Sequence, residues 1–249
     1  MFNFYNRTAV ITGAARGIGR EVALDIMRYG GNVCLCDLDE EGLKETVNLY
    51  KAADGKAVWL KADVSSESDV SALIDLAVSH FGTVDILVNN AGILADKNIG
   101  DISLEEFDKM MAVHLGGTFL TCREAIPYMK EKQYGRICNI TSLGARQGVY
   151  LAGSHYCAAK GGMTGFTRQL AQQLRGNGIT VNCVAPGTTK TELIKKRDPK
   201  ALEKVAKMFP VGRLGLPDEI SAAVLYLVSD WAQCITGETL DVNGGKYMT

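Results

Sequence analysis

Two side chains that can carry a proton, Tyr156 and Lys160, lie four residues apart. They open the segment 156–175, whose apolar residues recur with helical spacing, so both side chains share one helical face about 5–6 Å apart. A phenol has a reference pKa of about 10, and a neighbouring ammonium group favours the phenolate and lowers that pKa. The pair is therefore predicted to exchange a proton with an alcohol or ketone oxygen.

A third polar group, Ser142, follows the apolar run 137–141, which is typical of a buried strand. Open α/β sheets bind their ligands at the carboxyl ends of the strands. A hydroxyl there can hold a substrate oxygen and stabilise the charge that develops on it. A serine after a strand is more often a turn or helix cap, but together with Tyr156 and Lys160 it favours a catalytic role.

A glycine-rich segment, Thr12-Gly13-Ala14-Ala15-Arg16-Gly17-Ile18-Gly19, connects an apolar run to a helical pattern. Gly13 allows a sharp turn, and Gly17 and Gly19 let the backbone approach a diphosphate closely. Ile18 lies in the first turn of the helix, whose free N–H groups face the anion. The strand before and the helix after are the context that a dinucleotide-binding loop requires.

The nucleotide preference depends on two charged residues, Asp37 and Arg16. Asp37 stands at the tip of the second apolar run, where an acidic side chain accepts hydrogen bonds from the adenosine ribose and repels a 2′-phosphate. Arg16 could pair with that phosphate, or it could be solvated or paired elsewhere. A carboxylate facing a phosphate is an uncompensated repulsion, so the sequence predicts NAD(H), with NADP(H) disfavoured.

The elements that must position these residues alternate regularly along the chain. Short apolar, β-branched runs predict strands at 8–12, 32–37, 57–61, 86–89, 136–141, 180–185 and 239–242, and helical spacing is clear at 18–29, 68–81 and 156–175. This alternation predicts an α/β fold, a doubly wound parallel sheet (Rossmann fold) in three layers with right-handed crossovers. No linker or repeat interrupts it, so residues 1–249 are expected to form a single domain.

One basic stretch, residues 188–209, separates the sixth strand from the next helix. It holds seven Lys or Arg and three Asp or Glu, a net charge of +4. Insertions of this length are often lids or binding loops. A substrate lid and a solvated helical face are both compatible with the pattern.

The bulk composition excludes several other classes. The net charge is −1, which favours neither nucleic acid nor an anionic membrane as a partner. No apolar run reaches membrane-spanning length and no secretory signal is evident, so we expect a cytoplasmic protein. The seven cysteines have no metal-ligand spacing, so we expect reduced, packed thiols and no metal site.

These motifs together resemble the short-chain dehydrogenase/reductase family over essentially the whole chain. The resemblance rests on TGAARGIG, Asp37, Asp63-Val64, Asn89-Asn90-Ala91-Gly92, Ser142, Tyr156/Lys160, Pro186-Gly187 and Val242-Asn243-Gly244-Gly245. It implies that Asp63 and Val64 contact adenine, that Asn90 lies beside the cofactor, and that Lys160 also holds the nicotinamide ribose. It also implies that the nicotinamide is bordered by Pro186, Gly187 and Thr188. The family also implies hydride transfer and a homotetramer.

One position departs from the family pattern, because His114 stands where an asparagine is usual. By resemblance, that asparagine helps to hold a water between the lysine and bulk solvent. A neutral imidazole has one donor and one acceptor and could hold a water too. We therefore include His114 among the catalytic candidates and expect His114→Asn to retain activity while shifting the pH–rate profile.

The substrate is less well determined by sequence. The carboxyl-terminal part resembles the 3-oxoacyl-acyl-carrier-protein reductase and sugar or steroid alcohol dehydrogenase branch. Asn177 lies where such reductases often have arginine, and Asp37 disfavours their usual NADPH. A small secondary alcohol or ketone (polyol, hydroxy acid or steroid) is therefore the first prediction and the acyl-carrier reductase the second. A non-catalytic NAD(H) sensor is the alternative of another class, disfavoured by the matched Ser142, Tyr156 and Lys160.

Overall fold

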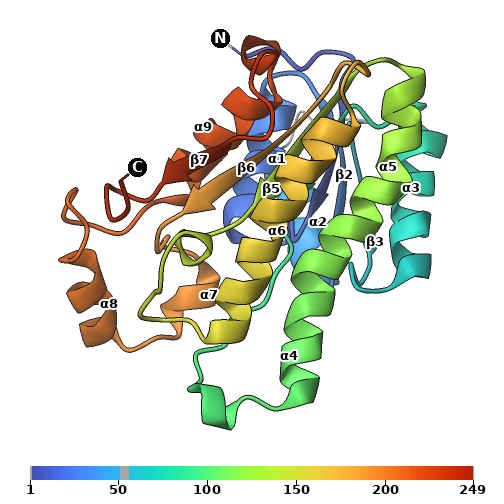
Figure 1. Ribbon diagram of the computed structural model, residues 1–249. Coiled ribbons are helices and arrows are strands. Elements are labelled where there is room, and N and C mark those ends of the chain that lie inside the picture. Colours follow the sequence, from blue (N-terminus) through green and yellow to red (C-terminus); the bar gives the residue numbers. More distant parts are fainter. Residues whose placement is uncertain (1, 51–55, 249) are drawn as a thin grey trace.

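The computed structural model, which describes residues 2–50 and 56–248, is built around a seven-stranded parallel sheet (Figure 1). The strand order is β3-β2-β1-β4-β5-β6-β7. The strands are β1 (Thr8–Thr12), β2 (Asn32–Asp37), β3 (Ala57–Lys61), β4 (Ile86–Asn89), β5 (Gly135–Ile140), β6 (Ile179–Pro186) and β7 (Thr239–Val242).

The predicted strands are confirmed, five of them to the residue. The two differences lie in β5 and β6, which start one residue earlier than predicted because Gly135 pairs with Ile179. Strand β6 also extends to Pro186, which pairs with Val242 of β7. A proline that lacks an N–H can end a strand in this way.

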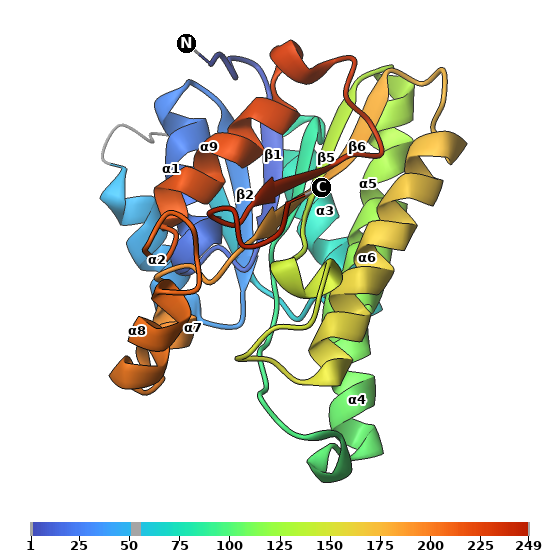
Figure 2. The same cartoon turned by 60° about the vertical axis from the view of Figure 1, so that its left-hand side comes forward.

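Helices cover both faces of the sheet, which gives the predicted three layers. Helices α1, α2 and α9 lie on one face, and α3, α5 and α6 lie on the other (Figure 2). The helices are α1 (Gly17–Arg28), α2 (Glu40–Leu49), α3 (Glu67–Phe81), α4 (Leu104–Met111), α5 (Gly117–Glu131), α6 (Ser154–Gln173), α7 (Glu192–Lys195), α8 (Pro199–Ala206) and α9 (Pro217–Val228).

Each face of the sheet has its own hydrophobic core. Alternate residues of a strand point to opposite faces, so Ile11 of β1 packs with α1 and α9 whereas Val10 packs with α3 and α5. Strands buried on both faces explain the near-continuous apolar runs in the sequence. The chain forms one Rossmann-like domain, and the fold prediction is confirmed.

The sheet topology brings the predicted site residues to one edge. Strand order reverses between β1 and β4, and ligands of such folds bind outside the carboxyl ends of the strands at this switch point. The glycine loop follows β1, Asp37 ends β2, and Ser142 follows β5. Residues far apart in sequence therefore meet at the carboxyl edge.

Helices α4 and α5 are joined without a break by a π-helical turn, Ala112–Gly116. The wider turn includes His114, whose side chain is buried. π-Helical turns inside α-helices are rare and occur frequently at functional sites.

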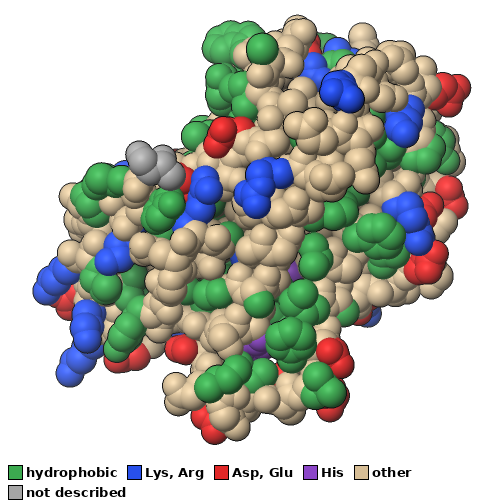
Figure 3. Space-filling view, viewed as in Figure 1, with side chains coloured by type: hydrophobic (Ala, Val, Ile, Leu, Met, Phe, Trp, Pro, Cys, Tyr) green, Lys and Arg blue, Asp and Glu red, His purple; other side chains and the backbone are tan. Residues whose placement is uncertain are grey.

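The basic stretch folds into the two short helices α7 and α8. Ile194, Val205 and Phe209 form a small apolar cluster with Leu214, separate from the two main cores. Lys and Arg side chains gather on the outer surface of this segment, over α8 (Figure 3). The segment thus buries an apolar cluster and exposes Lys and Arg side chains together with Leu193 and Met208.

Candidate active site

The glycine loop has little space for side chains. Gly13 and Gly17 have φ values of +66° and +58°, which favour glycine. A Cβ at Gly19 would overlap the carbonyl oxygen of Gly13, and one at Gly17 would lie 3.2 Å from Cγ2 of Thr191. Arg16 precedes α1 without forming a side-chain cap, so the helix start provides free backbone donors for an anion.

Asn90 fastens this loop to the neighbouring strand. Its Nδ2 donates to the carbonyl oxygens of Thr12 and Gly13, at 3.0 and 2.9 Å, and its backbone N–H donates to Oγ1 of Thr12 at 3.0 Å. The sequence placed Asn90 beside a cofactor but did not reveal this positioning role. Asn90 holds the loop in shape through side-chain bonds between β4 and β1.

The charged residues near the glycine loop are held by hydrogen bonds to Asp37 and by an ion pair of Arg16. The Asp37 carboxylate accepts hydrogen bonds from the N–H groups of Ala15, at 3.1 Å, and Asp39, at 3.0 Å. The guanidinium of Arg16 pairs with the Asp39 carboxylate. Of the alternatives open for Arg16, the structure shows pairing elsewhere, with a partner that the sequence had not identified.

The remaining nucleotide-site candidates follow β3 and β6. Asp63 accepts hydrogen bonds from the backbone N–H and hydroxyl of Ser65, and Val64 is buried against Gly117. Both lie at the same edge as Asp37, because the Ala62 N–H donates to the Asp37 carbonyl at 3.1 Å.

Pro186, Gly187 and Thr188 lead from the end of β6 into the basic segment. The Gly187 N–H donates to the Val242 carbonyl at 3.0 Å, and a Cβ at Gly187 would lie 2.7 Å from the Phe209 ring. The Thr188 carbonyl accepts a hydrogen bond from the Gly215 N–H at 3.0 Å. This turn is therefore held between β7 and the apolar cluster that contains Phe209.

Ser142 and Tyr156 are brought together between β5 and α6. The Ser142 hydroxyl accepts a hydrogen bond from the Gly144 N–H at 3.0 Å. A Cβ at Gly144 would lie 3.5 Å from both Ser142 Oγ and Tyr156 Cε1. Ser142 is thus the turn cap that the sequence offered as one alternative, and it lies beside Tyr156.

Lys160 is buried, and its ammonium donates to the Ile140 carbonyl at 2.6 Å. Burial lowers the pKa of Lys160 to about 7. Burial also raises the pKa of Tyr156, which the hydrogen bond with Ser142 opposes. The net direction is thus opposite to the lowering expected from the lysine, because burial of the phenol is the largest cause of its pKa shift.

His114 lies edge to face with Tyr156, their ring centroids 5.5 Å apart. Its Nε2 lies 2.9 Å from the Ile93 carbonyl, while Nδ1 is buried without a partner among the described residues. Burial, reinforced by the charge of Lys160, lowers the pKa of His114 to about 3. The imidazole is therefore neutral at physiological pH and does not add a positive charge that opposes the lysine.

Residues 188–209 contact the segment after β4 and the segment before α6. Arg197 pairs with Asp96 at 3.1 Å, and Lys204 lies over the Tyr150 ring. Leu94 and Leu151 of these two segments pack on the apolar cluster of Ile194, Val205, Phe209 and Leu214. These cross-site contacts were not foreseen, because nothing in the sequence pairs the basic stretch with either segment.

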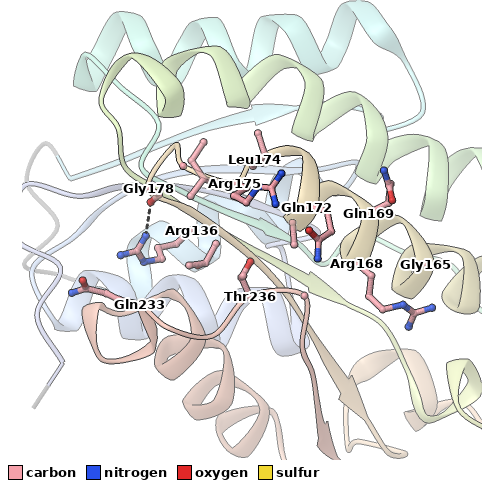
Figure 4. Close-up of a pocket in the computed structure, with 15 residues that line it drawn as sticks. Arg136, Gly165, Arg168, Gln169, Gln172, Leu174, Arg175, Gly178, Gln233 and Thr236 are labelled. Carbon is pink, nitrogen blue, oxygen red and sulfur yellow. Dashed lines mark hydrogen bonds between the residues drawn. The ribbon is translucent and has the colours of Figure 1, made fainter.

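A cavity of about 840 Å³ lies elsewhere, beside the amino end of β6 (Figure 4). Arg136, Arg168 and Arg175 line it, and an Arg136 guanidinium nitrogen donates to the Gly178 carbonyl at 3.1 Å. In the close-up, Arg136 and Arg168 point away from each other. This cavity is at the opposite edge of the sheet from Tyr156 and takes no part in the site.

The cysteines, the possible metal ligands and the lengths of the helices also bear on which class of site this is. All seven cysteines are free thiols. Within residues 2–50 and 56–248, no three His, Cys, Asp or Glu side chains are grouped to hold a metal ion. In the same part of the chain, no helix combines the length and apolarity needed to cross a membrane.

Comparison with known proteins identifies the family. Residues 13–246 match the family model described as enoyl-(acyl carrier protein) reductase. The 3-oxoacyl-[acyl-carrier-protein] reductase FabG of Rickettsia felis is 37% identical over 248 residues, with both chains fully covered. The reductase of the same name from Escherichia coli is 37% identical, with 99% of each chain covered.

Solved structures agree in fold over nearly the full length. Levodione reductase has a TM-score of 0.94 and 31% identity, with 98% of each chain covered. A short-chain dehydrogenase/reductase of Brucella melitensis, titled glucose/ribitol dehydrogenase, has a TM-score of 0.92 and 35% identity, with 100% of this chain and 99% of that chain covered. This chain belongs to the short-chain dehydrogenase/reductase family and is an oxidoreductase acting on a CH–OH group.

Proposed function

We propose that the chain interconverts a secondary alcohol and a ketone with NAD(H), and that Tyr156 moves the proton. The observation that carries the proposal is that Ser142 and Tyr156 both border Gly144, with buried Lys160 5.8 Å from the Tyr156 ring centroid, at the edge that also holds the glycine loop. Ser142 holds the substrate oxygen, and Tyr156 gives it a proton or takes one. Lys160, whose pKa lies near neutrality, can gain or lose a proton during the reaction.

The residues at the carboxyl edge fit a dinucleotide. Gly13, Gly17, Ile18 and Gly19 would cradle the diphosphate with backbone N–H groups, and side chains at the three glycines would intrude on this cradle. Asp63, Val64 and Asn90 would border the adenine side, and Pro186, Gly187 and Thr188 the nicotinamide side. When bound, the nicotinamide supplies or accepts the hydride.

NAD(H) is the proposed cofactor because the carboxylates of Asp37 and Asp39 lie where the 2′-phosphate of NADP(H) would bind. Asp37 stands at the end of β2, and Asp39 neutralises Arg16, the nearby cation that could pair with that phosphate. An added phosphate would meet repulsion without a free cation in the loop to compensate it. The arrangement of charges therefore supports NAD(H) over NADP(H).

The comparisons change the order of the substrate candidates. Curated relatives named 3-oxoacyl-[acyl-carrier-protein] reductase align over the whole chain at 37% identity, so we propose a 3-oxoacyl thioester as the first substrate class. We propose that residues 188–209 form a lid over the substrate, whose inner face, with Leu202, Val205 and Phe209, is apolar and suits an acyl chain. Its lysine-rich outer face suits an anionic carrier.

A small secondary alcohol or ketone is the second candidate. Levodione reductase, whose name denotes a small ketone substrate, matches with a TM-score of 0.94. Asn177, where acyl-carrier reductases often have arginine, is engaged with the carbonyls of Leu174 and Arg175. Because Asn177 is uncharged, an anionic carrier would not meet here the cation that an arginine provides.

The two candidates are separated by one assay of NADH oxidation. The substrates are acetoacetyl-CoA, an acetoacetyl carrier protein, keto acids, ketosugars and ketosteroids at matched concentrations. We expect the highest kcat/KM with one of the thioesters. Strong turnover of a small ketone with weak turnover of both thioesters would reverse this order.

A further inference from the structure

The cavity of about 840 Å³ beside the amino end of β6 has a cationic wall. Arg136, Arg168 and Arg175 line it, and the described residues of its wall include no aspartate or glutamate. Figure 4 shows the three guanidinium groups spread along the cavity rather than gathered at one point. Because no carboxylate among these residues neutralises them, the cavity favours an anion with several separated charges.

The shortness of β7 leaves this space open. Strand β7 pairs with β6 only from Cys183 onward. Nearer the amino end, the loop before β7 takes the place of the strand, because Oγ1 of Thr236 accepts a hydrogen bond from the Val181 N–H at 3.1 Å. Ile179 and Thr180, at the start of β6, therefore border the cavity instead of a neighbouring strand.

Two adjacent polar side chains in this wall are buried without a partner. Arg136 of β5 and Thr180 of β6 are paired in register, so their side chains lie on the same face of the sheet. They are 4% and 5% exposed. Among the described residues, neither Nε of Arg136 nor Oγ1 of Thr180 has a hydrogen-bond partner. Leaving such groups unpaired is costly, which points to a polar ligand at this wall.

The guanidinium of Arg136 is fixed in orientation by its other contacts. Its Nη1 donates to the carbonyls of Gly135 at 2.8 Å and Gly178 at 3.1 Å, and its Nη2 lies 3.5 Å from the Asp230 carboxylate. The Tyr134 ring stacks on it, with the ring centroid 4.2 Å from Cζ. Only the Nε–H is left without an acceptor. An Nε–H and a neighbouring Nη–H form the fork that binds the two oxygens of a carboxylate or phosphate.

We propose that this cavity binds a small organic polyanion, in which two or more phosphate or carboxylate groups are joined by a partly apolar frame. Arg136 and Thr180 hold one oxoanion group at the wall, and the exposed Arg168 and Arg175 pair with a second. Leu174, also in the lining, contacts the frame. The volume lies within the range of pockets that enclose organic ligands, about 300–1,000 Å³. The inference is independent of the proposed function, because none of these residues belongs to the catalytic or nucleotide-binding set.

The test is isothermal titration calorimetry with citrate and with pyrophosphate as probes, on the whole chain. NADH is present throughout, so that the dinucleotide cradle at the other edge of the sheet is occupied and does not bind the probe. We expect saturable binding of at least one probe to wild type. Tighter binding of citrate indicates a carboxylate ligand, and tighter binding of pyrophosphate indicates a phosphate ligand.

Three variants locate the binding. Replacing the exposed Arg168 and Arg175 together by glutamine should raise Kd at least about tenfold, because it removes one of the two anion contacts. Arg136→Lys keeps the charge but loses the fork, and it should also raise Kd. The matched control replaces Arg123 and Lys44 by glutamine, which removes two exposed cations that are paired with carboxylates elsewhere. Its Kd should stay within about twofold of wild type.

Three results would overturn the proposal. One is the absence of saturable binding of both probes at concentrations up to about 10 mM. Another is equal weakening in the two double variants, which indicates attraction by net charge and not a site. The last is an unchanged Kd when Arg168 and Arg175 are replaced. This double variant decides the question even if Arg136→Lys fails to fold, because both of its side chains are exposed.

Discussion

At the scale of single residues, burial rather than mutual charge sets the proton affinities of the site. Lys160 is enclosed and held by the Ile140 carbonyl, so its pKa falls to about 7. The spacing of Tyr156 and Lys160 in the sequence predicted their proximity correctly. Spacing could not reveal the desolvation of either group, because burial depends on residues from β5 and the loop after β4.

The depressed pKa of Lys160 predicts a pH dependence of stability. Between pH 7 and the ordinary lysine pKa of 10.5, the unfolded chain holds a proton that the folded chain has released. The free energy of unfolding therefore rises with pH in this window. Urea unfolding at pH 7 and pH 9 should show wild type gaining about 1–2 kcal/mol relative to Lys160→Met. Parallel changes in the two proteins would contradict the assignment.

Asp37 is predicted to determine the nucleotide preference. In Asp37→Ser, we expect the ratio of kcat/KM for NADPH to that for NADH to rise at least about tenfold, which corresponds to removing about 1.4 kcal/mol of repulsion. Glu40→Gln is a matched control, because Glu40 is a nearby carboxylate already paired with Lys44. Steady-state kinetics that show equal ratios in both variants would remove Asp37 from the cofactor site.

At the scale of elements, regular strands were predictable and irregular connections were not. All seven strands follow from apolar runs, and α6 from its periodicity. The π-helical turn at His114 has no sequence signal of its own, since it depends on how α4 and α5 pack. The contacts of the basic segment with Leu94, Asp96, Tyr150 and Leu151 are likewise tertiary.

The lid role proposed for residues 188–209 predicts a binding defect when its contact across the site is removed. Arg197→Gln breaks the ion pair with Asp96. Because a partly exposed pair contributes about 0.2–1 kcal/mol, we expect KM for the ketone substrate to rise about two- to fivefold with little change in kcat. The control is Lys195→Gln, whose partner Glu192 lies within the same helix. The same KM in the two variants would argue against a lid.

At the scale of the whole molecule, the domain leaves one helical surface open. A Cβ at Gly161 or Gly165 of α6 would meet nothing within 4 Å, and Phe107 and Phe119 of the adjoining helices are 39% and 46% exposed. Exposed apolar surface next to small residues is typical of association sites. We propose that this surface is an association site between copies of the chain, and we expect the homotetramer that the family resemblance implies.

The tetramer is tested by sedimentation. Wild type should migrate as four chains of 26.9 kDa each, and Gly165→Arg should shift the population to smaller species because the arginine fills the open face of α6. Gly148→Arg is the control, since Gly148 also has open space around it but lies in a loop. A wild-type monomer, or equal effects of both variants, would contradict this assembly.

The central claim is that Tyr156 moves the proton in an NAD(H)-dependent reduction, and Tyr156→Phe tests it most directly. The change removes the phenolic hydroxyl and retains the ring beside His114. With the best substrate of the assay, kcat should fall by about 10²–10⁴, while the Kd for NADH, measured by fluorescence titration, should stay within about threefold of wild type because the phenol holds no part of the dinucleotide cradle. Turnover close to wild type in Tyr156→Phe would contradict the account.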